Sequence, residues 1–326
     1  MKANLLIDWF SFTVKCKGFQ SINTGELHSS DMRDVQYVIE NILKIPFDCF
    51  HSLGYGRYGY RDCMSYEGIN VYYDGFGIDM GLSVSLSGNA CRVYERYHSM
   101  MELVKREHEE EEAHVTRIDL ACDDKTGVFD VPFIIDEIRG RRLRSLIRKK
   151  RGIVDLDGNS DEGDTVYIGS EKSEIRFRIY DKAKEQGDYK GVWNRIEGVF
   201  RRTRAEAVVD LLVGSGRDFG DCVSEIFNAQ IQFINLDDSN ITRCSVAQWW
   251  LDFIETVKCL KLALPELPKS SVDRLHKHFE VLSSCIYVLT EALGKQEWDS
   301  FYERGKDKAK PRHRQMISDY ISLTMA

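Results

Sequence analysis

Three strand-like segments of this chain place charged and aromatic residues at every second position. The segments are VTRIDLACD (115–123), SEIRFRIYDK (173–182) and WNRIEGVF (193–200). Because side chains alternate between the two faces of a strand, three such strands in one sheet would present these residues together on one solvent-exposed face. A tyrosine beside guanidinium and carboxylate groups could attack a phosphodiester. The residues in question are Arg117, Asp119, Arg176, Arg178, Tyr180, Arg195 and Glu197.

Tyr180 is the candidate nucleophile of this set. A phenol titrates near pH ~10, so it attacks at neutral pH only when cations stabilise the phenolate or a base takes its proton. Arg176 and Arg178, on the same predicted face, would stabilise the phenolate and neutralise a phosphate in the transition state. Tyr167 and Tyr189 are the nearest rivals.

Asp119 and Glu197 are the candidate metal ligands. Each follows an isoleucine and has an arginine two residues earlier, and carboxylate oxygens suit Mg²⁺ or Mn²⁺. The alternative is cross-strand pairing of arginine and carboxylate on an exposed sheet face, which contributes little energy. Within the candidate site, Arg117 and Arg195 would give secondary contacts to phosphate or carboxylate. Asp8, in LIDW, is a candidate third ligand.

Composition limits the class of protein. A chain of 326 residues, 43% hydrophobic and 30% charged, is typical of a soluble protein with two domains or one large domain and an appendage. The sequence contains no apolar run long enough for a membrane span, and Asp8 interrupts what would be a signal-peptide core. Nine scattered cysteines without a Cys-x-x-Cys pair favour reduced thiols in a cytoplasm.

One basic segment stands out against a net charge of −7: residues 139–151 hold eight basic residues and no acid. Such a run is either a solvated surface or a contact for the phosphate backbone of a nucleic acid. The candidate DNA-binding residues in it are Arg141, Arg142, Arg144, Arg148, Lys149 and Lys150.

The order of elements predicts an α+β fold. Residues 4–15 read as a strand with Leu6, Phe10, Phe12 and Val14 on one side, and Asp31 is a candidate N-cap. The segments 1–112 and 113–235 are weakly similar, which suggests two β-α-β-β units. Together they would form one large, mainly antiparallel sheet with helices on one face, leaving the other face for a ligand.

Residues 236–326 form the second predicted region, which is helical. Apolar spacing indicates helices at 245–261, 272–293 and 312–323. This region could serve in packing, in dimerisation, or in docking DNA or a partner protein.

These motifs together resemble the Rep_trans (replication initiation factor) family. The resemblance is carried by RIDLACDD, TVYIGS, FRIYDKAKE and WNRIEGVFRR in that order, and runs from about residue 5 to residue 236. In the tail, HFEVLSSCIYVLTEALG, EWDSFYE and RHRQMI are similar to the phage-type members. The family contains rolling-circle initiators of plasmids and phages, and relaxases of mobile elements.

The resemblance implies a nuclease that nicks one strand of single-stranded or hairpin origin DNA. Tyr180 would join the 5′ phosphate and leave a 3′ hydroxyl, and Asp119 and Glu197 would belong to a Mg²⁺ or Mn²⁺ site. A host helicase and a second copy of the chain are expected partners, in the cytoplasm of a bacterial host. The alternatives are a relaxase for conjugative transfer and a DNA-binding regulator without catalysis.

Overall fold

The structure is a computed structural model that describes residues 3–20, 27–154, 164–188, 190–260 and 294–309, with the single positions 287, 291 and 317. It divides into two compact units, Met1–Pro265 and Glu266–Ala326. Within the second unit the described helix is α11 (Lys295–Asp307). The helices expected at 272–293 and 312–323 lie outside the described residues apart from isolated positions. No helix in the described ranges is long and apolar enough to cross a membrane.

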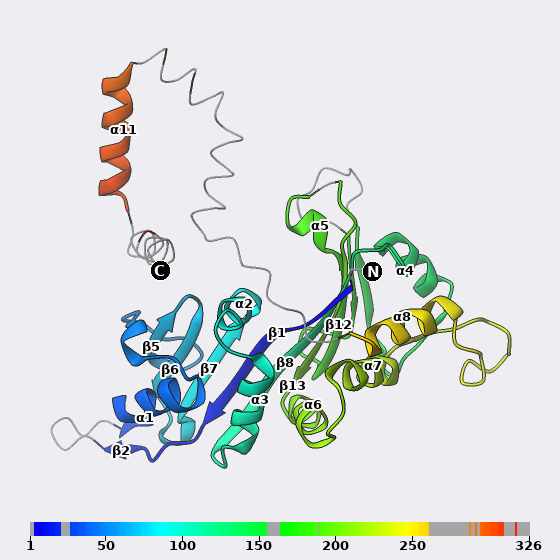
Figure 1. Ribbon diagram of the computed structural model, residues 1–326, viewed down its shortest axis with the longest axis horizontal. Helices are drawn as coiled ribbons and strands as arrows, with labels where there is room; N and C mark the ends of the chain where they lie inside the picture. The colour runs from blue at the N-terminus through cyan, green and yellow to red at the C-terminus, as the bar shows by residue number, and fades with distance from the viewer. Residues whose placement is uncertain are drawn as a thin grey trace. The chain divides into compact units, whose positions relative to one another are not determined.

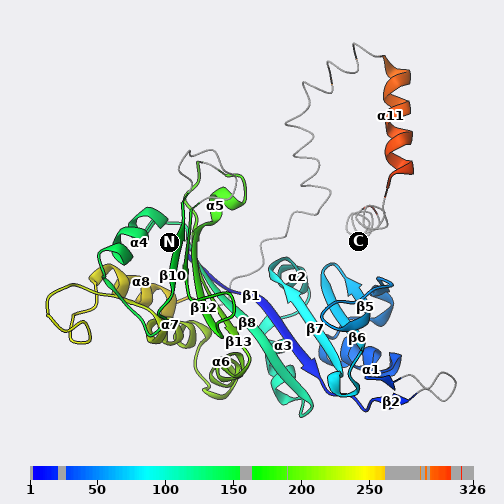
Figure 2. The ribbon, with the colours of Figure 1, turned by 180° about the vertical axis from the view of Figure 1, so that it is seen from behind.

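A ten-stranded antiparallel sheet forms the centre of the first unit, as the sequence predicted. Its strand order is β10-β11-β12-β13-β8-β1-β7-β6-β5-β4 (Figure 1). Seen from behind, β10 lies toward one end of the sheet and β5 toward the other (Figure 2). The small pairs β2–β3 and β9–β14 lie outside this sheet. The strands are β1 (Ala3–Val14), β2 (Phe19–Gln20), β3 (Leu27–His28), β4 (His51–Ser52), β5 (Tyr60–Tyr66), β6 (Ile69–Gly75), β7 (Leu82–Ser87), β8 (Ala113–Asp124), β9 (Leu143–Arg144), β10 (Lys150–Ile153), β11 (Thr165–Ile168), β12 (Ile175–Asp181), β13 (Asn194–Arg201) and β14 (Gln232–Phe233).

The strand order shows two halves that meet at the central pair β1–β8. In each half a central strand is followed by a helix and then by strands that return from the sheet edge, so that β7 pairs with β1 and β13 pairs with β8. This arrangement agrees with two similar units, each with two strands more in the large sheet than the predicted β-α-β-β. Residues 72–95 are weakly similar in sequence to residues 167–185, which would make β7 the counterpart of β12. In the structure β7 instead takes the place that corresponds to β13.

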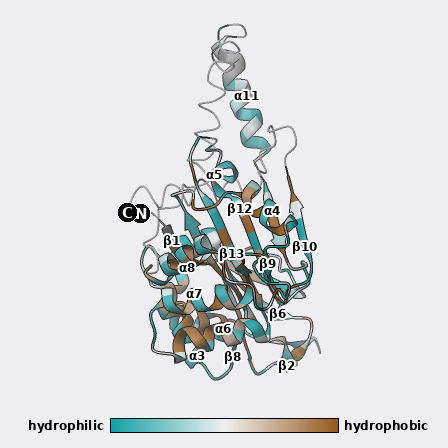
Figure 3. Cartoon of the chain, turned by 90° about the vertical axis from the view of Figure 1, so that its right-hand side faces the viewer, coloured by the Kyte–Doolittle hydropathy of each residue, from teal (hydrophilic) through white to brown (hydrophobic). Residues whose placement is uncertain are grey.

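The longer helices bury their apolar sides against one face of the sheet in a continuous core. Along β12 and its neighbours hydrophobic and hydrophilic residues alternate, which leaves the opposite face polar (Figure 3). The predicted N-cap Asp31 is confirmed, since its side chain accepts hydrogen bonds from the backbone N–H groups of Arg33 and Asp34. The helical elements are α1 (Met32–Tyr37), a π-helical turn (Val38–Ile42), 3₁₀ turns (Phe47–Cys49 and Ile78–Met80), α2 (Gly88–Tyr94), α3 (Met100–Glu109), α4 (Val131–Arg139), α5 (Lys182–Glu185), α6 (Thr203–Gly214), α7 (Phe219–Gln230) and α8 (Gln248–Lys258).

Helix α8 packs within the first unit, although its sequence lies in the predicted C-terminal helical region. Trp250 is fully buried, and Phe253 packs edge-on against Phe129 with ring centres 5.5 Å apart. The first compact unit therefore extends to Pro265.

A β-bulge at Asp8 changes the alternation along β1. Ile7 pairs with Leu120 and Trp9 with Asp119, so Asp8 is an extra residue between them. Leu5 and Ile7 join the core before the bulge, and the phase then shifts to Phe10 and the residues beyond it. The prediction that Leu6 shares a face with Phe10 was wrong, because strict alternation holds only in a strand without a bulge. The bulge turns both Asp8 and Trp9 toward the polar face.

Candidate active site

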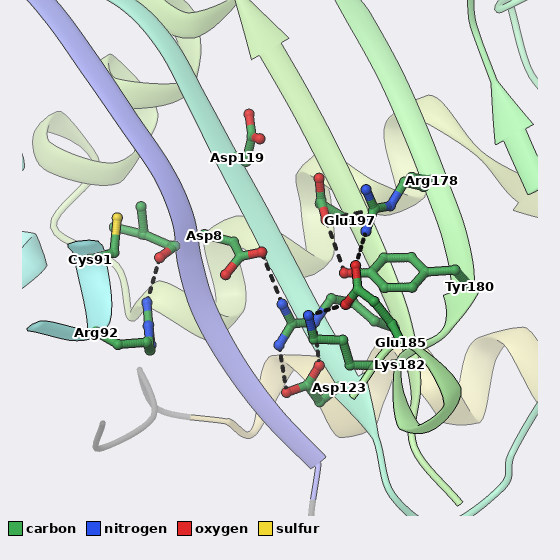
Figure 4. A network of polar contacts seen from close by, with 12 residues as sticks. Asp8, Cys91, Arg92, Asp119, Asp123, Arg178, Tyr180, Lys182, Glu185 and Glu197 are labelled. Atoms are coloured by element: carbon green, nitrogen blue, oxygen red, sulfur yellow. Dashed lines mark hydrogen bonds and ion pairs between the residues drawn. The ribbon is translucent and has the colours of Figure 1, made fainter. Parts of the chain in front are cut away.

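Three neighbouring strands bring the predicted residues together on the polar face of the sheet (Figure 4). Across β12 and β13, Arg178 pairs with Glu197 and Tyr180 pairs with Arg195. Across β13 and β8, Val199 pairs with Asp119. Asp119 and Glu197 are therefore diagonal neighbours, a relationship in which residues usually stand about 7–8 Å apart. The alternation read from the sequence is confirmed for all three strands.

Tyr180 lies between a carboxylate and a guanidinium. Its hydroxyl donates a hydrogen bond to Glu197 Oε2 over 3.4 Å, and the Arg178 guanidinium carbon stands 3.7 Å from the ring centre. Only 3% of the residue is exposed. Burial raises the pKa of Tyr180 far above its ordinary value; Arg195 and Arg178 oppose that shift and the charge of Glu197 adds to it. In this arrangement the phenol is held neutral.

The two carboxylates are also buried, which corrects the expectation of a wet face. Asp119 is 2% exposed and Glu197 is 7% exposed. Arg117 covers Asp119 by donating from Nε to Oδ1 over 2.8 Å, and its guanidinium also stacks on Trp9 at 4.2 Å. Strand alternation correctly predicted the face of the sheet on which the two acids lie, but long neighbouring side chains on that face exclude the solvent.

Burial also governs the charge of these acids. It raises the pKa of Asp119 to about 7, and the nearby negative charges of Glu197 and Asp8 add to the effect while Arg117 opposes it. The pKa of Glu197 is raised as well, mainly by burial. A cation placed beside Asp119 and Glu197 would oppose the effect of burial on both acids and that of the Glu197 charge on Asp119.

The donor set fits a divalent ion only in part. Among the described residues, no three His, Cys, Asp or Glu side chains gather closely enough to hold a metal by themselves. Mg²⁺ is commonly bound by one or two carboxylates and completes its shell with water and substrate phosphate. Asp119 and Glu197 match that pattern and not that of a site built from protein ligands alone.

Arg195 holds the base of the site together and is 5% exposed. It donates to both oxygens of Asp123, over 2.6 and 3.0 Å, and to Asp8 over 2.9 Å. Of the two roles expected for Arg195 and Arg117, phosphate or carboxylate contact, the structure gives both residues carboxylate partners. Asp8, the candidate third ligand, is a partner of Arg195.

Helix α2 begins close to the ion pairs that Arg195 makes with Asp8 and Asp123. Gly88 begins α2 beside Asp8, and a Cβ at that position would lie 2.7 Å from Asp8 Oδ1. A glycine is therefore needed where the helix meets the bulge.

Sequence reasoning missed three residues of this site. Asp123 shares the alternation of Asp119 in VTRIDLACD, so its parity was a usable signal. Lys182 and Glu185 come from α5, directly after β12, and contact Arg178 and Tyr180. A four-residue helix has too short a pattern to be predicted, so no local signal placed these two over the tyrosine.

The rival tyrosines differ in their surroundings. Tyr167 lies on β11, and the Arg176 guanidinium carbon stands 4.1 Å from its ring centre. Tyr189 lies outside the described residues. Since the described hydrogen bond from a phenol to one of the two candidate acids comes from Tyr180, the site geometry favours Tyr180 over Tyr167.

The basic segment 139–151 divides into two parts. Arg142 donates to Glu137 over 2.7 Å, and Arg144 binds Gln232 and backbone carbonyls of the loop before α8, so both are structural. The exposed basic residues are Arg139, Arg141, Arg148, Lys149, Lys150 and Arg151. Arg151 lies opposite Tyr167 across β10 and β11, which places the basic edge of the sheet beside the site face.

Comparison with known proteins identifies the family. The sequence signature described as "Replication initiation factor" matches residues 113–301, and the signature "Rolling Circle replication initiation protein N-terminal domain" matches residues 29–104. The chain belongs to the replication initiation factor family. The two signatures together cover the strands of the large sheet other than β1, and the resemblance inferred from the motifs is confirmed.

Two known proteins are similar to this chain over most of its length. It is 27% identical over 310 residues to the protein named putative DNA relaxase NicK of Bacillus subtilis (strain 168), a match that spans 89% of this chain and 86% of that protein. It is also similar to the solved structure of a rolling circle replication initiator protein from Geobacillus stearothermophilus. That match has a TM-score of 0.69 and 30% identity, and covers 81% of this chain and all (100%) of the other.

Proposed function

We propose that this chain is a rolling-circle replication initiator that nicks and rejoins one strand of origin DNA through a covalent link to Tyr180. The observation that carries the proposal is the position of the Tyr180 phenol between Glu197 and Arg178 on a buried polar face. Membership of the replication initiation factor family and the similarity to a rolling circle initiator support it. Single-stranded or hairpin DNA is the expected substrate, because the scissile phosphate must reach a buried tyrosine on β12, a strand within the sheet.

The reaction follows from the contacts. The Tyr180 oxygen bonds to the phosphorus as the bond from phosphorus to the 3′ oxygen breaks. The phenolic proton passes to Glu197, and the departing 3′ oxygen takes a proton from the surrounding water. Arg178, with Arg176 beside it, would neutralise charge on the phosphate. One phosphodiester replaces another, so attack by a 3′ hydroxyl on the phosphotyrosine rejoins the strand.

Asp119 and the second oxygen of Glu197 are the residues that would hold Mg²⁺ or Mn²⁺. Such an ion would act as a Lewis acid on a phosphate oxygen. Arg117 keeps Asp119 oriented toward this side of the sheet.

The remaining assignments concern the outer parts of the chain. We assign residues 1–235, with helix α8 packed against them, to the catalytic domain and the rest of 236–326 to contacts with a partner, with a host helicase and a second copy of the chain as candidates. The exposed basic residues Arg141, Arg148, Lys149 and Lys150 would contact DNA flanking the nick. These roles place the protein in the cytoplasm of its bacterial host.

The decisive experiment is incubation with supercoiled origin DNA and Mn²⁺. We expect nicked product with protein attached, no such product from Tyr180→Phe, and an attached product from the matched control Tyr167→Phe. Normal nicking by Tyr180→Phe would refute the assignment of Tyr180 as the nucleophile. Binding without nicking by the wild type would favour the DNA-binding regulator.

The similarity to a protein named as a DNA relaxase supports a second candidate, relaxase action in conjugative transfer. Its chemistry at Tyr180 is identical, so the nicking assay does not separate the two. A transfer assay with the mobile element does: only a relaxase would make transfer depend on Tyr180 when replication is supplied by another initiator.

A further inference from the structure

We propose that Arg178 and Lys182 form a binding site for a DNA phosphate beside Tyr180, and that the carboxylate of Glu185 occupies this site until DNA displaces it. The inference rests on the proposed function, because the phosphate would belong to the strand that is nicked. It makes Glu185 an internal competitor of the substrate.

The two cations converge on one carboxylate directly beside the tyrosine (Figure 4). Arg178 Nη2 donates to Glu185 Oε1 over 3.1 Å, and Lys182 Nζ donates to Glu185 Oε2. The Arg178 guanidinium carbon and Lys182 Nζ stand 3.7 and 5.7 Å from the centre of the Tyr180 ring. Any anion bound by this pair would therefore lie next to the phenol.

Glu185 leaves the site only partly satisfied. Arg178 Nε is buried and, within the described part of the chain, makes no hydrogen bond; Glu197 Oε2 is 3.9 Å from it. A buried guanidinium donor without a partner is costly, and a phosphodiester offers two unesterified oxygens in a geometry that suits arginine. The unused donor indicates that a larger anion than this carboxylate fits the site.

The same contacts close the tyrosine. Tyr180 is 3% exposed with Arg178 stacked on its ring, so very little of the residue is open to a phosphate in this arrangement. Glu185 holds Arg178 and Lys182 in place. When a DNA phosphate replaces Glu185, both cations can move with the bound DNA strand. Binding of the phosphate and exposure of Tyr180 would then occur in one step.

Glu185 is placed so that it can leave. Its side chain is 37% exposed, against 30% for Arg178 and 16% for Lys182, and it lies at the end of the single helical turn α5. Gly187 follows with a positive φ of 72°, which lets the chain turn away directly after the helix. Partly exposed ion pairs of this kind are weak, so a displaced Glu185 would lose little in water.

The experiment compares binding in a background that cannot nick. Full-length Tyr180→Phe, with and without Glu185→Gln, is titrated into a fluorescein-labelled oligothymidylate and followed by anisotropy. Removing the competitor should tighten binding roughly 3- to 10-fold. The matched control is Glu225→Gln on α7, which removes the same charge from an ion pair with Arg217 and should leave binding unchanged.

A second pair of variants separates competition from a structural role. In a background carrying Arg178→Gln the gain from Glu185→Gln should disappear, because the two changes act on the same contact. If Glu185→Gln binds no more tightly than Glu225→Gln, or if its gain survives Arg178→Gln, the proposal is wrong. Glu185→Ala repeats the comparison should the glutamine side chain itself bind Arg178. Both arms measure binding alone, so they stand even if Tyr180→Phe proves able to nick.

Discussion

The Tyr180 hydroxyl on β12 donates a hydrogen bond to Glu197 Oε2 on β13 over 3.4 Å. The two residues are diagonal neighbours, since Tyr180 pairs with Arg195 and Glu197 pairs with Arg178. A phenol and its proton acceptor are thus placed by strand register, which is set by the whole sheet. Substitutions on these strands should therefore separate chemistry from binding and from stability.

Glu197→Gln should slow nicking by about 100-fold or more, because the amide cannot take the phenolic proton. Binding of the labelled oligothymidylate should change little. The rate is measured from the loss of supercoiled DNA under single-turnover conditions. Glu174→Gln, which alters an exposed acid next to Arg202, should nick like the wild type. A normal rate for Glu197→Gln would remove Glu197 from the chemistry.

Mn²⁺ binding should strengthen as the pH rises through about 7, because burial raises the pKa of Asp119 to that value and a metal binds the ionised acid. Calorimetry in two buffers of different ionisation enthalpy would detect the released proton. Asp119→Asn should weaken this pH dependence and leave the contribution of Glu197, whose pKa burial also raises. Asp210→Asn, which alters an exposed acid beside His108, should preserve it. Binding that does not vary with pH would exclude Asp119 as a ligand.

Arg195→Ala should lower the free energy of unfolding by about 3–5 kcal/mol, because it leaves the carboxylates of Asp123 and Asp8 without their shared partner. Urea denaturation measures the loss. Arg217→Ala, which breaks an exposed pair with Glu225, is the matched control and should leave stability nearly unchanged. Equal effects of the two variants would show that the buried cluster contributes no special stability.

Stability should fall as the pH rises through about 7, in part because of Glu107. This residue is 3% exposed on α3, and burial raises its pKa to about 7, with Glu206 and Asp210 adding to the shift. Its folded pKa lies above its unfolded value, so its contribution is complete below about pH 4.3 and is lost as the pH rises through the folded pKa.

Glu107→Gln should therefore raise the free energy of unfolding on the order of 2 kcal/mol at about pH 8 and much less at about pH 5. Thermal unfolding at both pH values tests this. Glu102→Gln, at an exposed position of the same helix, should show no such difference. A gain that is the same at both pH values would contradict the assignment to titration of Glu107.

Neutralising the exposed end of the basic segment should weaken DNA binding and flatten its salt dependence. Wherever Arg148, Lys149, Lys150 or Arg151 binds a phosphate, its replacement by glutamine should reduce the slope of log K against log salt by about 0.7. Arg142→Gln should instead lower stability, because Arg142 binds Glu137. An unchanged slope for the exposed variants would remove this edge from the DNA interface.

Much of the candidate site could be read from the sequence because strand alternation is a local property. The shared face of Arg178 and Tyr180, the parity of Asp119 and the N-cap at Asp31 all depend on residues a few positions apart. The bulge at Asp8 could not be read, because an extra residue in β1 is defined only against its partner strand β8.

Burial and partner choice also lay beyond the sequence. The charged residues on the site face predicted exposure to solvent. In the structure Asp119 and Glu197 are instead enclosed by long side chains from neighbouring strands. The basic run looked uniform, whereas Arg144 binds a loop about a hundred residues away along the chain, as the 98-residue separation from Thr242 shows.

The sequence by itself determined the family, the α+β class and the face of each strand on which the reactive residues stand, since these depend on residue order and alternation. The tertiary structure alone decided which carboxylate each guanidinium binds, how far the tyrosine is covered and that Glu185 lies over it. Those relationships are between side chains on different elements, namely β1, β8, β12, β13 and α5. The distances between such side chains are fixed only when the strands pair in their final register.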